Sequence, residues 1–203
     1  MNTLVNFRPA QPSKTDQFSA GANNGPKDPD EMREILEFAR EQMLEMIGRP
    51  QCTHMRVNIV WKTTKNTLRV TYSCMMEDDP DDQLEFELDG GACGECWRRQ
   101  DIIFCDLVEA RGTYNADWKM SKYQQALVRR DLKSLLCVPI FVSPKSGSDD
   151  ADGEPRLVGV LNFDSTEDLK AEFENEDLHI FFAQIANIVS ECLEDADAYK
   201  ESL

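Results

Sequence analysis

Residues 134–165 read SLLCVPIFV SPKSGSDDADGEPR LVGVLNFDS, two apolar runs separated by a polar stretch. Each run has the length and the aliphatic content of a buried strand, and the polar stretch 143–156 is rich in the residues that form turns. The segment therefore predicts a β-hairpin with strands at 134–142 and 157–165. Pro139 lies inside the first strand, and because proline has no backbone N–H to donate, we expect a sheet edge or a bulge there.

Further strands are predicted on the N-terminal side of this hairpin. Residues 55–62 and 67–76 alternate apolar and polar side chains and flank a turn at 65–66, which predicts a second hairpin. Residues 84–88 and 102–107 predict two shorter strands. Strands that follow one another in hairpins form a mostly antiparallel sheet.

Helices are predicted at both ends of the chain and at two places between the strands. Apolar residues recur at helical spacing over 29–47, after Asp28 as N-cap, and over 176 to about 199, after Asn175 as N-cap. Shorter helices are predicted at 92–99 and 121–132. Long helices at both ends should cover one face of the sheet, which gives an α+β fold class. We expect a disordered tail at 1–27 and a single domain over 28–203.

Composition narrows the class of protein. The 203 residues carry a formal net charge of −16, which argues against a general nucleic-acid binder because phosphate binding needs a basic surface. No apolar run approaches the ~20 residues that span a bilayer, and the first residues lack the core of a signal peptide. We therefore expect a soluble, cytoplasmic protein.

The seven cysteines are an odd number, and without a signal peptide they predict reduced thiols rather than disulfides. Cys93 and Cys96 form a single CxxC, and the two histidines lie far from it, whereas structural zinc needs four ligands. We expect no metal and no cofactor. The two glycines before Cys93 favour a sharp turn that opens a short helix.

Positive charge is concentrated in one segment, which we call the basic island. Residues 98–133 hold eight Lys or Arg and five Asp or Glu, whereas the rest of the chain is strongly acidic. The island is either a solvated face or a rim that attracts an anion to a ligand pocket. Its members are Arg98, Arg99, Arg111, Lys119, Lys122, Arg129, Arg130 and Lys133.

Several stretches in fixed order resemble the GAF domain family over about residues 28–196. That family shows a Gly-x-x-Gly turn before a short helix, a strand that ends near Asp, a Ser-x-x-x-x-Pro-Ile strand, a Gly-Val-Leu strand and a Phe-x-x-x-Asp before the last helix. The matching residues are Gly91 and Gly94; Asp106; Ser134, Pro139 and Ile140; Gly159, Val160 and Leu161; Phe173 and Asp177.

The resemblance implies a GAF-like antiparallel sheet with terminal helices on one face and a small-molecule pocket closed by short helices on the other. It also implies a parallel homodimer through the helices at 29–47 and 176–196. Aromatic residues near the basic island are expected in the core or the pocket wall, among them Tyr114. The expected ligand-binding residues are Cys93, Trp97, Arg98, Asp106, Trp118, Tyr123, Arg129, Ser134, Asn162 and Asp164.

Three branches of the family differ from this chain in particular residues. Cyclic-nucleotide-binding members carry Asn-Lys where this chain has Ser165-Thr166. Free methionine-R-sulfoxide reductases share the turn around Cys93 but need two further cysteines, expected near Gln83 and Val128. Cys105 is a misplaced substitute for them. Bilin-binding members attach pigment through a cysteine near a histidine, and no such pair is visible here.

The sequence thus predicts a non-catalytic sensory GAF domain that binds a small, anionic molecule and signals through a dimer or a downstream partner. Two alternatives stay open. The first is a reductase of free methionine-R-sulfoxide with Cys93 as nucleophile, and the second is a dimerisation scaffold without a ligand.

Overall fold

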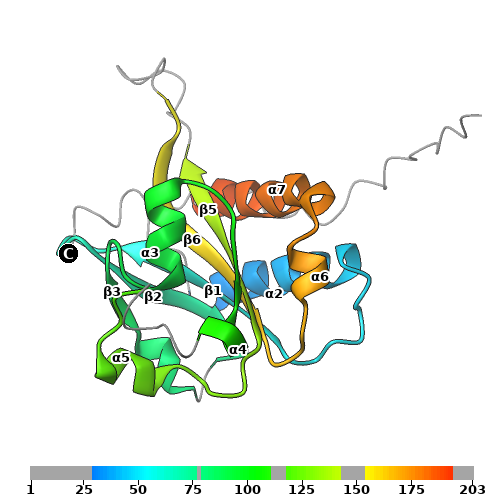
Figure 1. Ribbon diagram of the computed structural model, residues 1–203. Coiled ribbons are helices and arrows are strands. Elements are labelled where there is room, and N and C mark those ends of the chain that lie inside the picture. Colours follow the sequence, from blue (N-terminus) through cyan, green and yellow to red (C-terminus); the bar gives the residue numbers. More distant parts are fainter. Residues whose placement is uncertain (1–28, 77–78, 111–117, 143–153, 194–203) are drawn as a thin grey trace, which may run out of the picture.

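The computed structural model describes residues 29–76, 79–110, 118–142 and 154–193. Six strands form one sheet in the order β3-β2-β1-β6-β5-β4, and every neighbouring pair is antiparallel. The predicted α+β class with an antiparallel sheet is confirmed (Figure 1). The elements are α2 (Pro29–Met46), β1 (Met55–Lys62), β2 (Thr67–Cys74), η1 (Pro80–Gln83), β3 (Glu85–Glu87), α3 (Gly91–Arg99), β4 (Ile103–Asp106), α4 (Leu107–Ala110), α5 (Lys122–Leu127), β5 (Ser134–Val142), β6 (Arg156–Ser165), α6 (Lys170–Phe173) and α7 (Glu176–Leu193).

The helices α2 and α7 lie side by side on one face of the sheet (Figure 1). Their apolar stripes pack on alternate residues of the two central strands, such as Val57 of β1 and Phe163 of β6, which are paired in register and fully buried. We call this side the helix face. It forms a continuous apolar core, as the helical spacing of apolar residues predicts.

The opposite face of the sheet is covered by α3, α4 and α5 (Figure 1). We call it the cavity face. It has its own smaller apolar cluster, in which Cys93 and Cys96 of α3 and Cys137 of β5 are buried.

Two glycines of α3 set how closely this helix approaches the sheet. Gly91 has φ of +67°, a left-handed conformation that glycine adopts without steric cost. At Gly94 a Cβ atom would lie 2.6 Å from the backbone carbonyl carbon of Asp89, so only glycine fits. The predicted glycine turn that opens a short helix is confirmed.

The two predicted hairpins, 55–62 with 67–76 and 134–142 with 157–165, are confirmed as β1–β2 and β5–β6. The expectation of a sheet edge at Pro139 is confirmed for one side of β5: β4 pairs only with Ser134–Cys137, so in the described part of the sheet Pro139 lies beyond the end of β4 and faces β6 alone. A register shift does occur one residue later, between Ile140 and Phe141, so the sheet accommodates proline by a local irregularity.

The helix predicted at 121–132 is shorter than expected. A capping box between Ser121 and Gln124 starts α5, which ends at Leu127 because Val128 adopts an extended backbone. Val128 and Leu132, which follow the end of α5, both line the cavity described below. The last predicted helix is confirmed over 176–193, while its end, the tail 1–27, the N-cap Asp28, Arg111 and Tyr114 lie outside the described residues.

Candidate functional site

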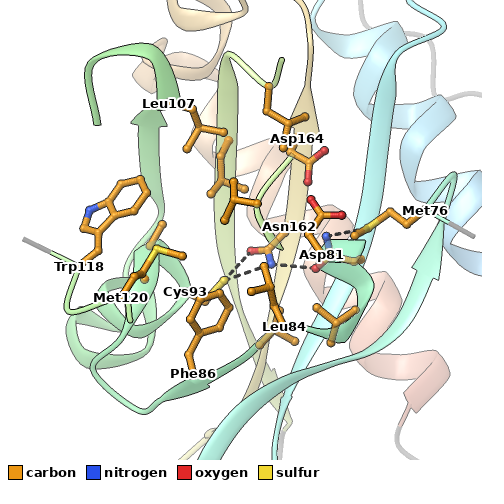
Figure 2. Close-up of a pocket in the computed structure, with 18 residues that line it drawn as sticks. Met76, Asp81, Leu84, Phe86, Cys93, Leu107, Trp118, Met120, Asn162 and Asp164 are labelled. Atoms are coloured by element: carbon orange, nitrogen blue, oxygen red, sulfur yellow. Dashed lines mark hydrogen bonds between the residues drawn. The ribbon is translucent and has the colours of Figure 1, made fainter. Parts of the chain in front are cut away.

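A cavity lies on the cavity face, between the sheet, the start of α3 and the segments on either side of α5 (Figure 2). About 70 Å³ of it is open to water-sized molecules, which is room for a small ligand. Most of its wall is apolar, and its polar side chains come from the sheet and from η1. It is lined by Asn58, Val60, Val70, Met76, Asp81, Leu84, Phe86, Gly91, Ala92, Cys93, Leu107, Trp118, Met120, Val128, Leu132, Leu135, Asn162 and Asp164.

The polar part of the wall is built from residues that face each other across β1 and β6. Arg56 pairs in register with Asp164, and two residues further along Asn58 pairs with Asn162. Side chains alternate between the two faces of a strand, so these four point to the cavity face while their neighbours point to the helices. All four are buried, with exposures of 5% or less.

Arg56 is held by three carboxylates. Its Nε and Nη2 donate to Asp164 at 2.6 and 3.0 Å, and its Nη1 and Nη2 donate to Asp81 at 3.0 and 2.8 Å. Its Nη1 also donates to Asp79 at 2.6 Å. These five contacts match the five N–H donors of a guanidinium, so the arginine has no donor left for a ligand. We call Arg56, Asp79, Asp81 and Asp164 the Arg56 cage.

The Arg56 cage carries more negative than positive charge. With all groups ionised, one guanidinium and three carboxylates sum to −2. Arg129 approaches Asp79 at 3.3 Å, but it is partly exposed and also pairs with Asp131 at 2.7 Å. The excess negative charge lies next to the cavity, because Asp81 and Asp164 are both part of its wall.

Burial and the neighbouring charges shift the pKa values of Arg56 and Asp164 in the cage. Burial lowers the pKa of Arg56, but the charges and hydrogen bonds of Asp164 and Asp81 outweigh this and raise it overall. Burial also raises the pKa of Asp164, and Asp81 and Asp79 raise it further, against the lowering effect of Arg56. The pKa of Asp164 is therefore raised in spite of its ion pair with Arg56.

A second polar group lies beside the cage in the same wall (Figure 2). The amide Nδ2 of Asn162 donates to Asn58 Oδ1 at 2.9 Å and lies 3.3 Å from Cys93 Sγ, while the Cys93 thiol lies 3.6 Å from Asn162 Oδ1. Asn58 in turn donates to Met76 Sδ at 3.4 Å. These contacts fix the amide and place one thiol at the cavity.

Figure 2 shows the opposite wall, where Trp118 and Met120 lie away from the two aspartates. The Trp118 carbonyl accepts a hydrogen bond from Gly91 N at 2.7 Å, which ties this wall to the start of α3. The cavity thus has an acidic side and an apolar side, an arrangement that orients an amphiphilic ligand.

Four of the ten predicted ligand-binding residues line this cavity: Cys93, Trp118, Asn162 and Asp164. The structure brings them together from α3, β6 and the segment before α5, as the resemblance implies.

The other six lie elsewhere. Asp106 and Ser134 have structural hydrogen bonds: the Asp106 carboxylate accepts from Val108 N at 2.9 Å, and Ser134 Oγ accepts from Leu169 N at 2.8 Å. Trp97 is half-buried on α3 with the Lys62 ammonium 5.8 Å from its ring centroid. Tyr123 is 68% exposed, so it contributes nothing to the cavity.

Arg98 and Arg129 correct the interpretation of the basic island as a pocket rim. Arg98 pairs with Glu95 at 2.6 Å on the exposed side of α3. Arg129 contacts Asp131 and Asp79 behind the cavity wall. None of the described Lys or Arg residues of the island lines the cavity, and Arg98, Arg99, Lys119 and Arg129 pair with nearby carboxylates.

Sequence analysis missed Arg56, Asn58 and Asp81. The stretch MRVNIV (55–60) was interpreted as alternating apolar and polar, and alternation usually means that one side faces water. All six of these residues are in fact buried, so the polar alternate face is internal. A positive charge within an otherwise apolar strand was the available signal for an internal acidic partner.

Among the described residues, no group of three or more His, Cys, Asp or Glu side chains is placed to hold a metal ion. Within the same part of the chain, none of the helices has the length and apolarity needed to cross a membrane. Of the positions where a reductase would need cysteines, Val128 lines the cavity and Gln83 lies at the end of η1.

Comparisons with known proteins agree with this fold. The family model of the GAF domain matches residues 31–193. No curated protein matches the sequence significantly. Three similar solved structures have low sequence identity to this chain. The GAF domain from Acinetobacter phosphoenolpyruvate-protein phosphotransferase is 12% identical, with a TM-score of 0.56, and the match covers 90% of this chain and 89% of that one.

The second, a methyl-accepting chemotaxis protein fragment, is 18% identical with a TM-score of 0.57, and the match covers 91% of this chain and 97% of that one. The third, free methionine-R-sulfoxide reductase from Neisseria meningitidis, is 16% identical with a TM-score of 0.49, covering 84% and 89%. At these identities the likeness concerns the fold alone, and the third is too distant to bear on activity.

Proposed function

The chain belongs to the GAF domain family, a regulatory sensory family, and from this premise we propose that its cavity binds a small organic cation with an apolar body. The observation that carries the proposal is the Arg56 cage, in which three carboxylates surround one guanidinium beside the cavity.

Two carboxylates of the cage have capacity left for a ligand. Each carboxylate offers about four lone-pair positions, and Arg56 uses two of them on Asp164 and two on Asp81. Both side chains line the cavity, so an ammonium group there gains charge-assisted hydrogen bonds. A cation also compensates the excess negative charge that the fold buries, whereas an anion adds to it.

The rest of the cavity wall suits an apolar body. Trp118 and Met120 lie across from the carboxylates, and Phe86, Leu84 and Leu132 add further apolar atoms to the lining. Burial of apolar area contributes roughly 25 cal/mol per Å², so a short hydrocarbon chain adds to the affinity of the ammonium group. The anionic ligand predicted from the basic island is replaced by a cationic one, because none of the described basic residues lines the cavity.

Signalling in this proposal follows from the way β6 contributes to both faces of the sheet. Asp164 and Asn162 line the cavity, while the intervening Phe163 packs under the helix face. A ligand that binds one conformation of β6 more tightly increases the population of that conformation. Because α2 and α7 pack on β6, the surface that these helices present to a partner changes with it. A downstream signalling protein is the proposed receiver.

The homodimer stays a prediction. Its interface was expected at the apolar stripes of α2 and α7, and the structure buries these stripes against the sheet. The exposed residues of α2 include Glu34, Glu37, Glu41 and Glu45. A parallel pairing of two such acidic surfaces is opposed by like charges, so a dimer is expected to weaken at low salt. Light scattering after gel filtration at two salt concentrations measures this.

Three small molecules of equal size and different charge test the ligand proposal: n-butylammonium, n-butanol and butyrate, each at equal ionic strength. We expect butylammonium alone to raise the thermal unfolding midpoint and Asp164→Asn to remove this effect. Asp89→Asn is the matched control, because Asp89 is an exposed carboxylate that pairs with Lys119, and neither residue lines the cavity. The control variant should respond like the natural protein.

The same experiment decides between the alternatives. A rise in midpoint that is as large with butyrate as with butylammonium overturns the cation proposal and restores the anionic one. No response to any of the three molecules overturns ligand binding at this cavity and favours the scaffold alternative.

A further inference from the structure

Four of the seven cysteines gather in the small apolar cluster of the cavity face. Cys93 and Cys96 come from α3, Cys105 from β4 and Cys137 from β5, and all four are buried free thiols. The proposed ligand site uses only the position of Cys93 in the wall. The remaining thiols have no role in that proposal.

The register of the sheet places Cys137 beside Cys93. Cys137 of β5 is directly opposite Asn162 of β6, and side chains opposite each other in an antiparallel pair point to the same face, with Cβ atoms about 5 Å apart. The Asn162 amide lies 3.3 Å from Cys93 Sγ. The Cys93 and Cys137 side chains therefore both lie beside the same amide.

The two thiols of this pair differ in access and in acidity. Cys93 lines the cavity, whereas Cys137 is fully buried behind it. The neighbouring Cys137 thiol, together with the Asn162 amide, lowers the pKa of Cys93 despite its burial. Burial and the neighbouring Cys93 raise the pKa of Cys137. A thiolate on Cys93 with Cys137 as the protonated neighbour is the arrangement that these effects favour.

The other two cysteines of the cluster do not share these properties. Cys96 and Cys105 are absent from the cavity wall. Burial raises the pKa of Cys96, and it raises the pKa of Cys105 to about 12. They are therefore internal controls for any reaction at the pair.

We propose that Cys93 and Cys137 form a redox-active dithiol, which a small hydroperoxide entering the cavity oxidises to a disulfide between α3 and β5. The Cys93 thiolate attacks the terminal oxygen of the hydroperoxide, the O–O bond breaks, and the leaving alkoxide or hydroxide takes up a proton. Cys93 is then a sulfenic acid. The Cys137 sulfur attacks the Cys93 sulfur, an S–S bond forms, the S–O bond breaks, and water leaves with the Cys137 proton.

In sum, two thiols and one alkyl hydroperoxide give one disulfide, one alcohol and one water, and with hydrogen peroxide the products are one disulfide and two waters. Thiol reductants of the glutathione class reverse the reaction by exchange, with two thiols oxidised for each disulfide reduced. The disulfide draws Cys93 away from Asn162 and so changes the wall of the cavity. The inference does not depend on the proposed cationic ligand.

The test uses the full chain, first reduced, then desalted and treated with a small excess of hydrogen peroxide while folded. The protein is next denatured, alkylated and analysed by mass spectrometry. We expect five of the seven cysteines to take up alkylating reagent, and a peptide map to join Cys93 to Cys137. After treatment with dithiothreitol all seven should take it up.

Variants separate the pair from its neighbours. Cys137→Ser should leave Cys93 as a sulfenic acid that reacts with dimedone, and Cys93→Ser should abolish both the disulfide and the dimedone adduct. Cys96→Ser and Cys105→Ser are the matched controls and should keep the Cys93–Cys137 bond. The map of the unsubstituted protein is decisive even if a buried substitution impairs folding: seven alkylated cysteines after peroxide, or a disulfide at any other pair, overturns the proposal.

Discussion

The two faces of the central sheet differ although the same two strands build both. On the helix face, β1 and β6 present Val57 and Phe163, which are fully buried among other apolar side chains. On the cavity face the neighbouring residues, Arg56 and Asp164, form a buried ion pair. One residue of displacement along each strand separates an apolar core from a charged wall.

The difference shows that one face of the sheet contributes mainly to stability and that the other carries the groups suited to binding. Apolar burial is non-directional and proportional to area, so the helix face stabilises the fold without specifying a ligand. Hydrogen bonds and charges are directional, and a buried polar network is costly when any member is unpaired. The cavity face therefore contributes less to stability for its size and carries the groups that recognise a ligand.

The largest effect is expected on the helix face. Phe163→Ala removes a fully buried ring from the apolar core and should lower the free energy of unfolding by roughly 4 kcal/mol. Urea unfolding measures the loss. If the substitution prevents folding, Phe163→Leu should show a smaller loss. A cost below that of the Arg56 variant described next would break the division between the two faces.

The next largest effect is expected at the centre of the Arg56 cage. Arg56→Met keeps much of the side-chain volume but leaves three carboxylates without their cation, which should cost about 3 kcal/mol. Arg69→Met, on the exposed side of β2, is the control and should cost little.

A second substitution sharpens this prediction. In the double variant Arg56→Met with Asp164→Leu, stability should recover in part, because one unpaired charge is removed along with its partner. Additive losses in the double variant would show that the two residues are not coupled in the way the hydrogen bonds indicate.

A smaller effect concerns pH. Because burial raises the pKa of Asp164, the folded chain binds this proton more tightly than the unfolded chain does. This proton therefore adds to the free energy of unfolding below the ordinary pKa of aspartate. The contribution is lost as pH rises from that ordinary pKa through the raised pKa of Asp164. Asp164→Asn should lack this decline, as measured by urea unfolding between pH 4 and 7 (roughly the window above an unperturbed aspartate).

Asp89→Asn is a control in which the pH dependence of stability has the opposite sign. The hydrogen bond from Lys119 lowers the pKa of Asp89, so its contribution is present above the ordinary aspartate value and is lost as pH falls through the lowered one. The same direction of change in both variants would contradict the assignment of buried excess charge to the cavity face.

The smallest effect is expected at the basic island. Arg98→Glu reverses a charge that is largely exposed and pairs only with its helix neighbour Glu95 in the part of the chain described. The thermal midpoint should stay within about 2 °C of the original, and the response to butylammonium should be unchanged. A lost response would restore the basic island as part of the binding site.

Sequence patterns alone determined most of the secondary structure and one side of the site. These elements follow from local patterns, so each can be predicted without knowledge of the rest of the chain. The patterns are the alternation in β1 and β2, the hairpin from 134 to 165 and the apolar stripes of the terminal helices. The family resemblance led to Cys93, Asn162 and Asp164, which do line the cavity. The end of α5 was misjudged, because the chain leaves the helical conformation at Val128 without a glycine or proline to mark the position in the sequence.

Only the tertiary structure decided which charges meet. Arg56 and Asp164 are 108 residues apart in sequence, and they face each other because β1 and β6 pair in one register. Cys137 lies beside Cys93 for the same reason, since its strand pairs with β6 opposite Asn162. Alternation fixes the side of the sheet to which a residue points, but it leaves the partner open. The partner depends on strand order and register, and these are set by the packing of the whole chain.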